Sequence, residues 1–210
     1  MLSVIPFVLG PVETNCYLVG DNKSGEAVMI DPAWDGNLIV EEAIHNGLSI
    51  NAIWLTHAHF DHIAGVGGIC CAMELAPPVA LHKDDLFIWQ AEGGAPLFGL
   101  HIDPGPEPSI MLVDRQILEV GEYQFEVRHT PGHTPGHVVF YCRDEELVFC
   151  GDVIFQNGIG RTDLPGGSYR TLMNSIKLEI LSLPNETRLL SGHGFETTVG
   201  DERRNNPFLV

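Results

Sequence analysis

The chain has 210 residues, and its 28 acidic and 11 basic side chains give a formal net charge of −17 at pH 7. This charge repels phosphate backbones and anionic lipid surfaces, so we expect neither nucleic acid nor a membrane as a partner. No segment approaches the roughly 18 uninterrupted apolar residues of a membrane span. Residues 1–10 resemble a strand more than a signal peptide. We therefore expect a soluble, cytoplasmic protein.

The first half of the chain alternates predicted strands and helices. Apolar runs and helical periodicity give this order: strands at 3–9, 15–20 and 26–31, a helix over 36–46, a strand at 50–55, a helix over 62–75 and a strand–helix pair within 78–86. Residues 92–109 then hold four glycines and four prolines, which predicts an irregular connection. Long loops of this kind are often functional, and we expect this one to close over a substrate.

The second half is rich in closely spaced strands. They are expected at 116–120, 123–130, 137–142 and 146–152, followed by a helix over 168–181 and a strand at 187–192. Both halves run through strands to a histidine-rich strand end, and then to a helix and a strand. One domain over residues 1–210, with two facing sheets and helices outside, fits this order.

The segment THAHFDH (56–62) directly follows an apolar strand and holds three histidines and an aspartate. His57 and His59 stand two residues apart, so both side chains can point to one side of an extended strand end. Asp61 and His62 lie where the chain turns into a helix and reach a different point. A polar turn does not need three histidines at this spacing, so we interpret the segment as a source of ligands for two neighbouring metal ions.

Polar residues also follow other predicted strands, namely Asp31, His133, Asp152 and His193. Sites in open α/β sheets form where loops leave the carboxyl ends of strands, so we expect these residues to gather near THAHFDH. Nitrogen and oxygen ligands without thiolate suit zinc, and also iron or manganese. Asp152 could bridge two ions. Four other histidines are expected to be surface or structural residues: His45, His82, His101 and His129.

The chain resembles a metallo-β-lactamase-superfamily hydrolase, and within that superfamily the small glyoxalase II-like (hydroxyacylglutathione hydrolase-like) proteins. The matching motifs run nearly end to end: GPVETNCYLV, MIDPA, LTHAHFDHIAG, HTPGHTPGHVVFY, GDVIFQNGIGRTDLPGG and LSGHG. The resemblance implies an α/β fold of four αββα layers, in which two mixed β-sheets face each other. A dinuclear metal centre would lie between the ends of the sheets.

The resemblance also implies roles for individual residues. It gives two ligand groups and a bridge: His57, His59 and His133 for the first ion, Asp61, His62 and His193 for the second, and Asp152 between them. Asp31 matches a family aspartate that orients a ligand, because metal-bound histidines usually donate their other N–H to such a group. His137 belongs to the PGHTPGH pattern, and we expect it to give structural support.

A hydroxide bridging two divalent ions is available at neutral pH and would attack an acyl carbonyl, whose oxygen one ion polarises. A thioester suits this chemistry, because its thiolate can depart without a general acid. Asp61 would help to orient the hydroxide, and Asp152 would hold both ions. We therefore expect a thioesterase that cleaves S-lactoylglutathione or a related small-molecule thioester with two divalent ions, in the first place Zn²⁺, with iron or manganese possible.

Substrate contacts are less well specified. Arg161 matches a basic residue that contacts glutathione in glyoxalase II, although it could equally pair with Asp163. Tyr169 is a second candidate for substrate contact. Only 17 residues follow His193, too few for the C-terminal helical domain that supplies much of the glutathione site in full-length glyoxalase II. We therefore expect a thioesterase of broader specificity.

Other reactions of the same fold stay open. A persulfide dioxygenase would use one iron, held by His57, His133 and Asp152 in a facial triad. A lactonase would use the same hydroxide as the thioesterase. The negative charge disfavours a nuclease, and the lack of a secretion signal disfavours β-lactam cleavage. The sequence leaves the oligomeric state open.

Overall fold

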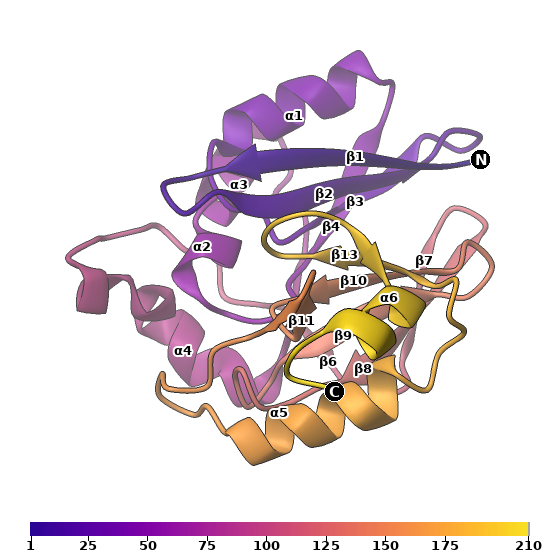
Figure 1. Cartoon of the computed structure of the whole chain (residues 1–210). Helices are drawn as coiled ribbons and strands as arrows, with labels where there is room; N and C mark the ends of the chain where they lie inside the picture. Colours follow the sequence, from indigo (N-terminus) through magenta and orange to yellow (C-terminus); the bar gives the residue numbers. More distant parts are fainter. Residues whose placement is uncertain (210) are drawn as a thin grey trace.

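A computed structural model describes residues 1–209, and two six-stranded sheets face each other at its centre (Figure 1). The first sheet holds, in spatial order, β1 (Leu2–Leu9), β2 (Thr14–Asp21), β3 (Glu26–Ile30), β4 (Ser49–Trp54), β5 (Val79–His82) and β6 (Ile110–Leu112). The second holds β14 (Thr197–Thr198), β13 (Arg188–Ser191), β10 (Leu147–Gly151), β9 (Val138–Cys142), β8 (Tyr123–His129) and β7 (Ile117–Val120). A separate hairpin pairs β11 (Ile154–Phe155) with β12 (Gly158–Ile159).

The inner faces of the two sheets share one apolar core. Trp54 of β4 lies 5.4 Å from Phe125 and 5.3 Å from Phe140 between ring centroids, and so joins the sheets. The centre of strand β2, CYLV, is a continuous apolar run because both faces of the strand are buried there. Val19 faces the inner core, whereas its neighbour Leu18 faces the outer helices. Full burial of each such side chain stabilises the fold by about 1.5–3 kcal/mol.

Helices cover the outer face of each sheet (Figure 1). The first sheet is covered by α1 (Gly36–His45), α2 (Phe60–Ile63), α3 (Val66–Ala72) and α4 (Leu86–Gln90), and the second by α5 (Tyr169–Ser175), its continuation η3 (Ile176–Ile180) and α6 (Val199–Asn205). Helices α1 and α3 touch at Gly36, where a Cβ would lie 2.3 Å from the backbone nitrogen of Ile69. The layers are thus αββα, and the predicted fold class is confirmed. No helix among residues 1–209 is both long enough and apolar enough to cross a membrane.

Two parts of the chain differ from the prediction. The single helix expected over 62–75 is divided into α2 and α3, because Gly65 donates its backbone N–H to the carbonyl of Pro32 instead of continuing the helix. The connection expected to be irregular over 92–109 begins with a 3₁₀ segment, η2 (Glu92–Phe98), which follows the short turn η1 (Lys83–Asp85) and α4. Positive φ angles of 63° and 79° at Gly93 and Gly94 bend η2 sharply.

Parallel pairing decides where the polar strand ends meet. Strands β3, β4 and β5 run parallel to one another in the first sheet, and β10 runs parallel to β13 in the second. Their carboxyl ends therefore lie on one edge of the two-sheet core, and the loops that follow them meet there.

Candidate metal centre

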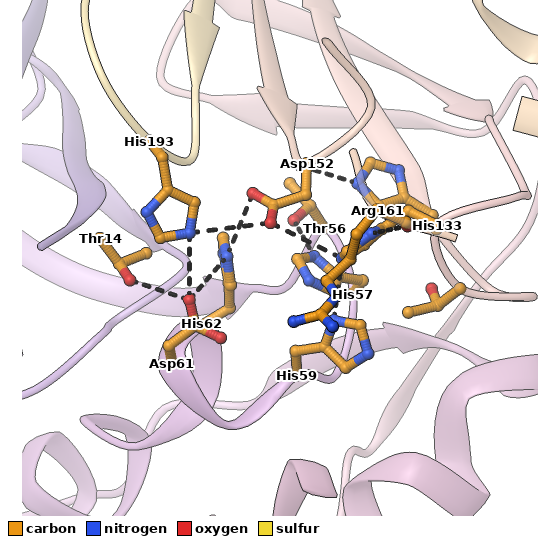
Figure 2. A network of polar contacts seen from close by, with 12 residues as sticks. Thr14, Thr56, His57, His59, Asp61, His62, His133, Asp152, Arg161 and His193 are labelled. Carbon is orange, nitrogen blue, oxygen red and sulfur yellow. Dashed lines mark hydrogen bonds and ion pairs between the residues drawn. The ribbon is translucent and has the colours of Figure 1, made fainter. Parts of the chain in front are cut away.

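The structure brings the seven expected ligands together at this edge (Figure 2). His57 and His62 are fully buried, and His133 is 2% exposed. The side chain of His193 is 30% exposed, so the cluster opens to solvent on that side. Seven titratable side chains from both sheets thus share one nearly closed space.

His57, His59 and His133 form the first group, with ligand atoms within 4.8 Å of one another. His57 and His59 come from the loop after β4, and His133 comes from the loop after β8. Nδ1 of His59 lies only 2.8 Å from Nε2 of His133. Two ring nitrogens at this distance need a proton or a cation between them.

Asp61, His62 and His193 form the second group, also within 4.8 Å of one another. Nε2 of His193 lies 3.1 Å from Asp61 Oδ2, and Nε2 of His62 lies 3.5 Å from the same oxygen. The hydroxyl of Thr14 donates to Asp61 Oδ2 at 2.9 Å and fixes this carboxylate from the side of β2.

Asp152 lies between the two groups, as Figure 2 shows. Its Oδ1 is 3.3 Å from Nε2 of His62. Its Oδ2 is 3.6 Å from Nε2 of His133 and 3.7 Å from Nε2 of His193. One carboxylate therefore faces members of both groups.

Hydrogen bonds on the far side of each ring decide which nitrogen faces the centre. The hydroxyl of Thr56 donates to Asp31 Oδ2 at 2.6 Å, so its oxygen accepts from Nδ1 of His57 at 3.0 Å. Nδ1 of His62 donates to Asp31 Oδ2 at 3.0 Å. Both histidines therefore present Nε2 to the centre. Asp31 thus fixes the rings of two expected ligands, directly at His62 and through Thr56 at His57.

His133 is held in the same way from the second sheet. Its Nδ1 donates to the backbone carbonyl of Arg161 at 2.8 Å, which leaves the lone pair on Nε2. His137 supports the backbone of the neighbouring strand end: its Nε2 accepts from the N–H of Asp152 at 3.1 Å, and its Nδ1 donates to the hydroxyl of Thr130 at 2.8 Å. These hydrogen bonds fix the orientation of the His133 ring and of the backbone that carries Asp152.

Three buried polar atoms at the centre have no hydrogen-bond partner, namely Nε2 of His57, Nε2 of His62 and Oδ1 of Asp152. Leaving a buried polar group unpaired costs about 1–3 kcal/mol. Nε2 of His57 and Oδ1 of Asp152 carry lone pairs, and Nε2 of His62 carries one once its proton is lost, so a cation would satisfy all three. Histidine nitrogens and carboxylate oxygens in two groups of three fit divalent ions such as zinc, iron or manganese.

The electrostatics agree with a cationic occupant. Burial and neighbouring histidines hold the pKa of His57 well below its usual value, and burial lowers the pKa of His59 to about 3. Both rings are therefore neutral, which is the form that binds metals. Burial opposes a charge on His62 as well, yet Asp61, Asp152 and Asp31 raise its pKa well above 6.5. The three carboxylates thus stabilise a positive charge at the centre, either a proton on His62 or a divalent ion in its place.

Asp85 is a supporting residue that the sequence did not reveal. Its buried carboxylate accepts from the backbone N–H of Ala58 at 3.1 Å, the hydroxyl of Thr134 at 2.7 Å and the backbone N–H of Gly136 at 2.6 Å. Ala58 lies between two ligands of the first loop, and Thr134 follows a ligand of the second. In the sequence, Asp84-Asp85 resembles any solvated acidic pair, so no local signal marks it.

The two candidate substrate contacts differ in position. Arg161 lines the cavity beside the centre, but its guanidinium pairs with Asp163 through two 2.8 Å hydrogen bonds. Tyr169 is 55% exposed and is not among the cavity-lining residues. It is the first residue of α5, after the capping Ser168, so the structure does not place it at the site.

Another histidine pair does not form a metal site, although His82, Asp84 and His129 lie close together. The rings of His82 and His129 stack with 4.4 Å between centroids and 15° between planes. In-plane lone pairs on stacked rings point in parallel directions and do not converge on one ion. Nε2 of His129 also donates to the carbonyl of Pro135 at 2.9 Å. This pair is structural.

A cavity of about 670 Å³ opens beside the metal centre. Its floor includes His59, Asp61, His133, Asp152 and His193. Its walls come from the turn after β1, from α4 and η2, and from residues 164–165. A small molecule bound there would contact the expected ligands directly.

A family model described as the metallo-beta-lactamase superfamily matches residues 9–193. The chain belongs to this superfamily. It is therefore a metal-dependent hydrolase by family. Among known proteins, the chain is 40% identical to the probable metallo-hydrolase YqgX of Bacillus subtilis, with 96% of this chain and 94% of that protein covered. It is 35% identical to the hydroxyacylglutathione hydrolase GloC of Haemophilus influenzae, with 99% and 97% covered.

Solved structures of superfamily members superpose closely. The BLEG-1 B3 metallo-beta-lactamase has a TM-score of 0.91 at 39% identity, with 99% of this chain and all of that chain covered. The di-iron-bound form of TTHA1623 has a TM-score of 0.88 at 42% identity, with 98% of this chain and all of that chain covered. Proteins similar to this chain along its full length thus include one named as a hydroxyacylglutathione hydrolase and one described as a metallo-beta-lactamase.

Proposed function

We propose that this protein is a glyoxalase II-like thioesterase, which hydrolyses S-lactoylglutathione or a related small-molecule thioester with two divalent metal ions. The observation that carries the proposal is the position of Asp152, whose two oxygens face His62 and His133 from the two ligand groups. One carboxylate between two groups of three ligands suits a pair of ions. The relative named hydroxyacylglutathione hydrolase supports a thioester as the substrate.

The residues at the cavity floor suit direct attack by water. When bound, the ions would acidify a water molecule and polarise a carbonyl oxygen. Asp61 would orient that water through its carboxylate, and Asp152 would fix the distance between the ligand groups. Among residues 1–209, those lining the cavity include no serine, threonine, cysteine or lysine, so they offer no hydroxyl, thiol or amine nucleophile. The thiolate product needs no general acid, because the pKa of a cysteine-type thiol is near 8.5.

Zinc is the metal that we propose first, because both groups contain only nitrogen and oxygen donors and need no redox chemistry for hydrolysis. Iron and manganese suit the same donors, and TTHA1623 is known in a di-iron-bound form. Elemental analysis of the purified protein identifies the metal and its stoichiometry. We expect two ions per chain, and one ion per chain would contradict the dinuclear centre.

The decisive experiment measures hydrolysis of S-D-lactoylglutathione by metal-replete protein, beside His59→Ala. We expect turnover in the wild type and its loss in the variant, together with a lower metal content. His45→Ala is the matched control, because this histidine ends α1 away from the site. No turnover by folded, metal-loaded wild type would overturn the glyoxalase II-like assignment. Oxygen uptake with a persulfide substrate would then assign an iron dioxygenase, and ring opening of a lactone would assign a lactonase.

β-Lactam hydrolysis is the second candidate, because BLEG-1 is described as a B3 metallo-beta-lactamase and is 39% identical over the whole chain. The same water and carbonyl chemistry opens a β-lactam ring. Hydrolysis of a chromogenic cephalosporin, compared with S-D-lactoylglutathione by kcat/KM, separates the two. A larger kcat/KM for the cephalosporin would replace the thioesterase proposal.

A further inference from the structure

The cavity walls beyond the metal centre are almost entirely apolar. Val12, Phe87, Leu97 and Phe98 line the cavity and are 46–69% exposed. They belong to three separate segments, namely the turn after β1, helix α4 and η2. Large apolar side chains gathered from different segments around one opening mark a binding surface. The wall is therefore a feature of the tertiary structure and not of one apolar stretch of sequence.

The charged side chains in the cavity walls are already paired. Arg161 makes two hydrogen bonds to Asp163, each 2.8 Å long. Glu92 accepts from Nδ1 of His101 and from the backbone N–H of Ile102, each at 3.1 Å. No other lysine or arginine lines the cavity among residues 1–209. Glutathione carries two carboxylates, and the cavity wall offers no unpaired cation to bind them.

The apolar wall is fixed to the metal-binding loop. Gly93 of η2 packs against Phe60, where a Cβ would lie 2.3 Å from the Phe60 backbone nitrogen. The rings of Phe60 and Phe98 are 5.4 Å apart between centroids. Phe60 stands between His59 and Asp61 in the sequence, so η2 packs directly on the loop that carries these expected ligands. An apolar group bound at the wall would lie beside a carbonyl bound at the centre.

From these contacts we infer that the preferred substrate of the proposed thioesterase carries an uncharged apolar arm next to the scissile carbonyl. The inference takes the reaction from the proposed function. The apolar character of the arm is inferred only from the residues that line the cavity wall. The arm is either the acyl chain or the alkyl part of the thiol, and both would bury the same methylenes against Leu97 and Phe98. Burial of each methylene in such a cavity raises kcat/KM about fourfold.

The test uses two series of thioesters with the metal-replete protein. In one series the acyl chain grows from acetyl to octanoyl on N-acetylcysteamine. In the other the acetyl group is constant and the alkyl thiol grows from ethyl to octyl. We expect kcat/KM to rise about fourfold per methylene in one series until the cavity is filled, and that series identifies the side. Octanoyl or octyl compounds should exceed S-D-lactoylglutathione in kcat/KM.

Variants locate the effect on the wall. Leu97→Ser should reduce the increase per methylene to less than twofold, whereas Leu178→Ser should leave it unchanged. Leu178 is similarly exposed, at 64%, but lies on η3 outside the cavity. A flat dependence on chain length in both series would overturn the inference while leaving the thioesterase intact. A change of oligomeric state in Leu97→Ser, with no change in chain-length dependence, would assign the wall to a second copy of the chain and would also overturn it.

A binding measurement tests the apolar arm independently of the proposed thioester hydrolysis. Ketones in which a methylene replaces the thioester sulfur are not hydrolysed, and calorimetry gives their affinities. Affinity that rises with chain length in the wild type and not in Leu97→Ser would support the apolar arm even if no thioester were turned over. In that case the thioesterase proposal alone would fail. Equal affinities along the series would overturn the apolar arm whatever the turnover.

Discussion

The carboxylate of Asp85 accepts a hydrogen bond of 2.6 Å from the backbone N–H of Gly136, 51 residues further along the chain. The same carboxylate accepts from Ala58, so it connects the ligand loop of the first sheet to that of the second. Both backbone groups are buried, so their N–H donors depend on this carboxylate for a hydrogen-bond acceptor. Asp85 is therefore a positioning residue for the metal centre.

Asp85→Ala should destabilise the metal-free protein by about 3 kcal/mol, because two buried N–H groups and a hydroxyl lose their acceptor. It should also weaken zinc binding by about 10–100-fold, the usual effect of removing support for ligands. Chemical denaturation and competition with a chromogenic chelator measure the two effects. Asp84→Ala is the matched control, since Asp84 is adjacent and half exposed. Equal zinc affinities in the wild type and Asp85→Ala would contradict the positioning role.

Asp85 should also give the fold a specific pH dependence. Burial raises its pKa from 3.8 to about 6, although three accepted hydrogen bonds act in the opposite direction. Because the folded-state pKa is the higher one, this stabilising contribution is complete below pH 3.8 and is lost as the pH rises through 6. Between pH 4 and pH 7, the unfolding free energy of the metal-free wild type should fall relative to Asp85→Asn by on the order of 3 kcal/mol. A difference that is independent of pH would show that Asp85 does not titrate in this range.

Removal of metal should lower the thermal stability of the protein. The centre gathers three buried atoms without partners and several carboxylates, and an ion that binds only the folded state stabilises it by mass action. At a free zinc concentration of about 1,000 Kd the gain is about 4 kcal/mol. Scanning calorimetry before and after chelation, and again after zinc is restored, measures it. Identical melting temperatures in all three states would argue against a metal site.

Thr56→Val tests the hydrogen bonds that fix the His57 ring. The variant removes the hydroxyl between Asp31 and His57 with little change in shape, so Nδ1 of His57 loses its acceptor. We expect about a 10–100-fold loss of affinity for one of the two ions, seen as a biphasic zinc titration. Thr187→Val is the control, because its buried hydroxyl has no partner and its loss should be neutral or stabilising. A monophasic, unchanged titration in Thr56→Val would show that this hydroxyl does not orient a ligand.

Thiol labelling should distinguish the cysteines by position and show that none takes part in hydrolysis. All five are free: Cys71 is exposed, Cys70 is partly buried, and Cys16, Cys142 and Cys150 are buried. Burial raises the pKa of Cys16 to about 12 and that of Cys150 further. In the native protein, Cys71 should react first with a disulfide reagent and Cys70 more slowly, and the other three only after denaturation. Labelled protein should keep its activity, and inactivation by labelling would implicate a thiol.

Sequence patterns predict the layers and the ligand cluster well, for physical reasons. Strands such as β9 and β10 are apolar at nearly every position because both of their faces are buried, and this pattern is easy to recognise in the sequence. The ligands stand directly after such strands, and parallel pairing of β3 with β4 and of β10 with β13 makes their positions converge. The two-residue strand β14 was not predicted, because it is too short to show a period.

The supporting contacts were harder to predict, because they depend on backbone groups that are distant in sequence. Asp85 accepts from residues 27 and 51 positions away, and no local pattern records such pairings. Arg161 supports His133 through its carbonyl, which any residue type could provide. The bend of η2 at Gly93 follows from its packing on Phe60, a tertiary contact that a count of glycines and prolines does not reveal.

The chain divides between its sheets at a single point, since the first sheet uses residues up to Leu112 and the second begins at Ile117. Each ligand group nevertheless crosses this division, because His133 completes the first group and His193 completes the second. An ion bound by all three members of either group is therefore a cross-link between the N-terminal and C-terminal halves of the molecule. A change that weakens metal binding should therefore also weaken the packing of the two halves against each other, and a change that weakens this packing should lower the metal affinity.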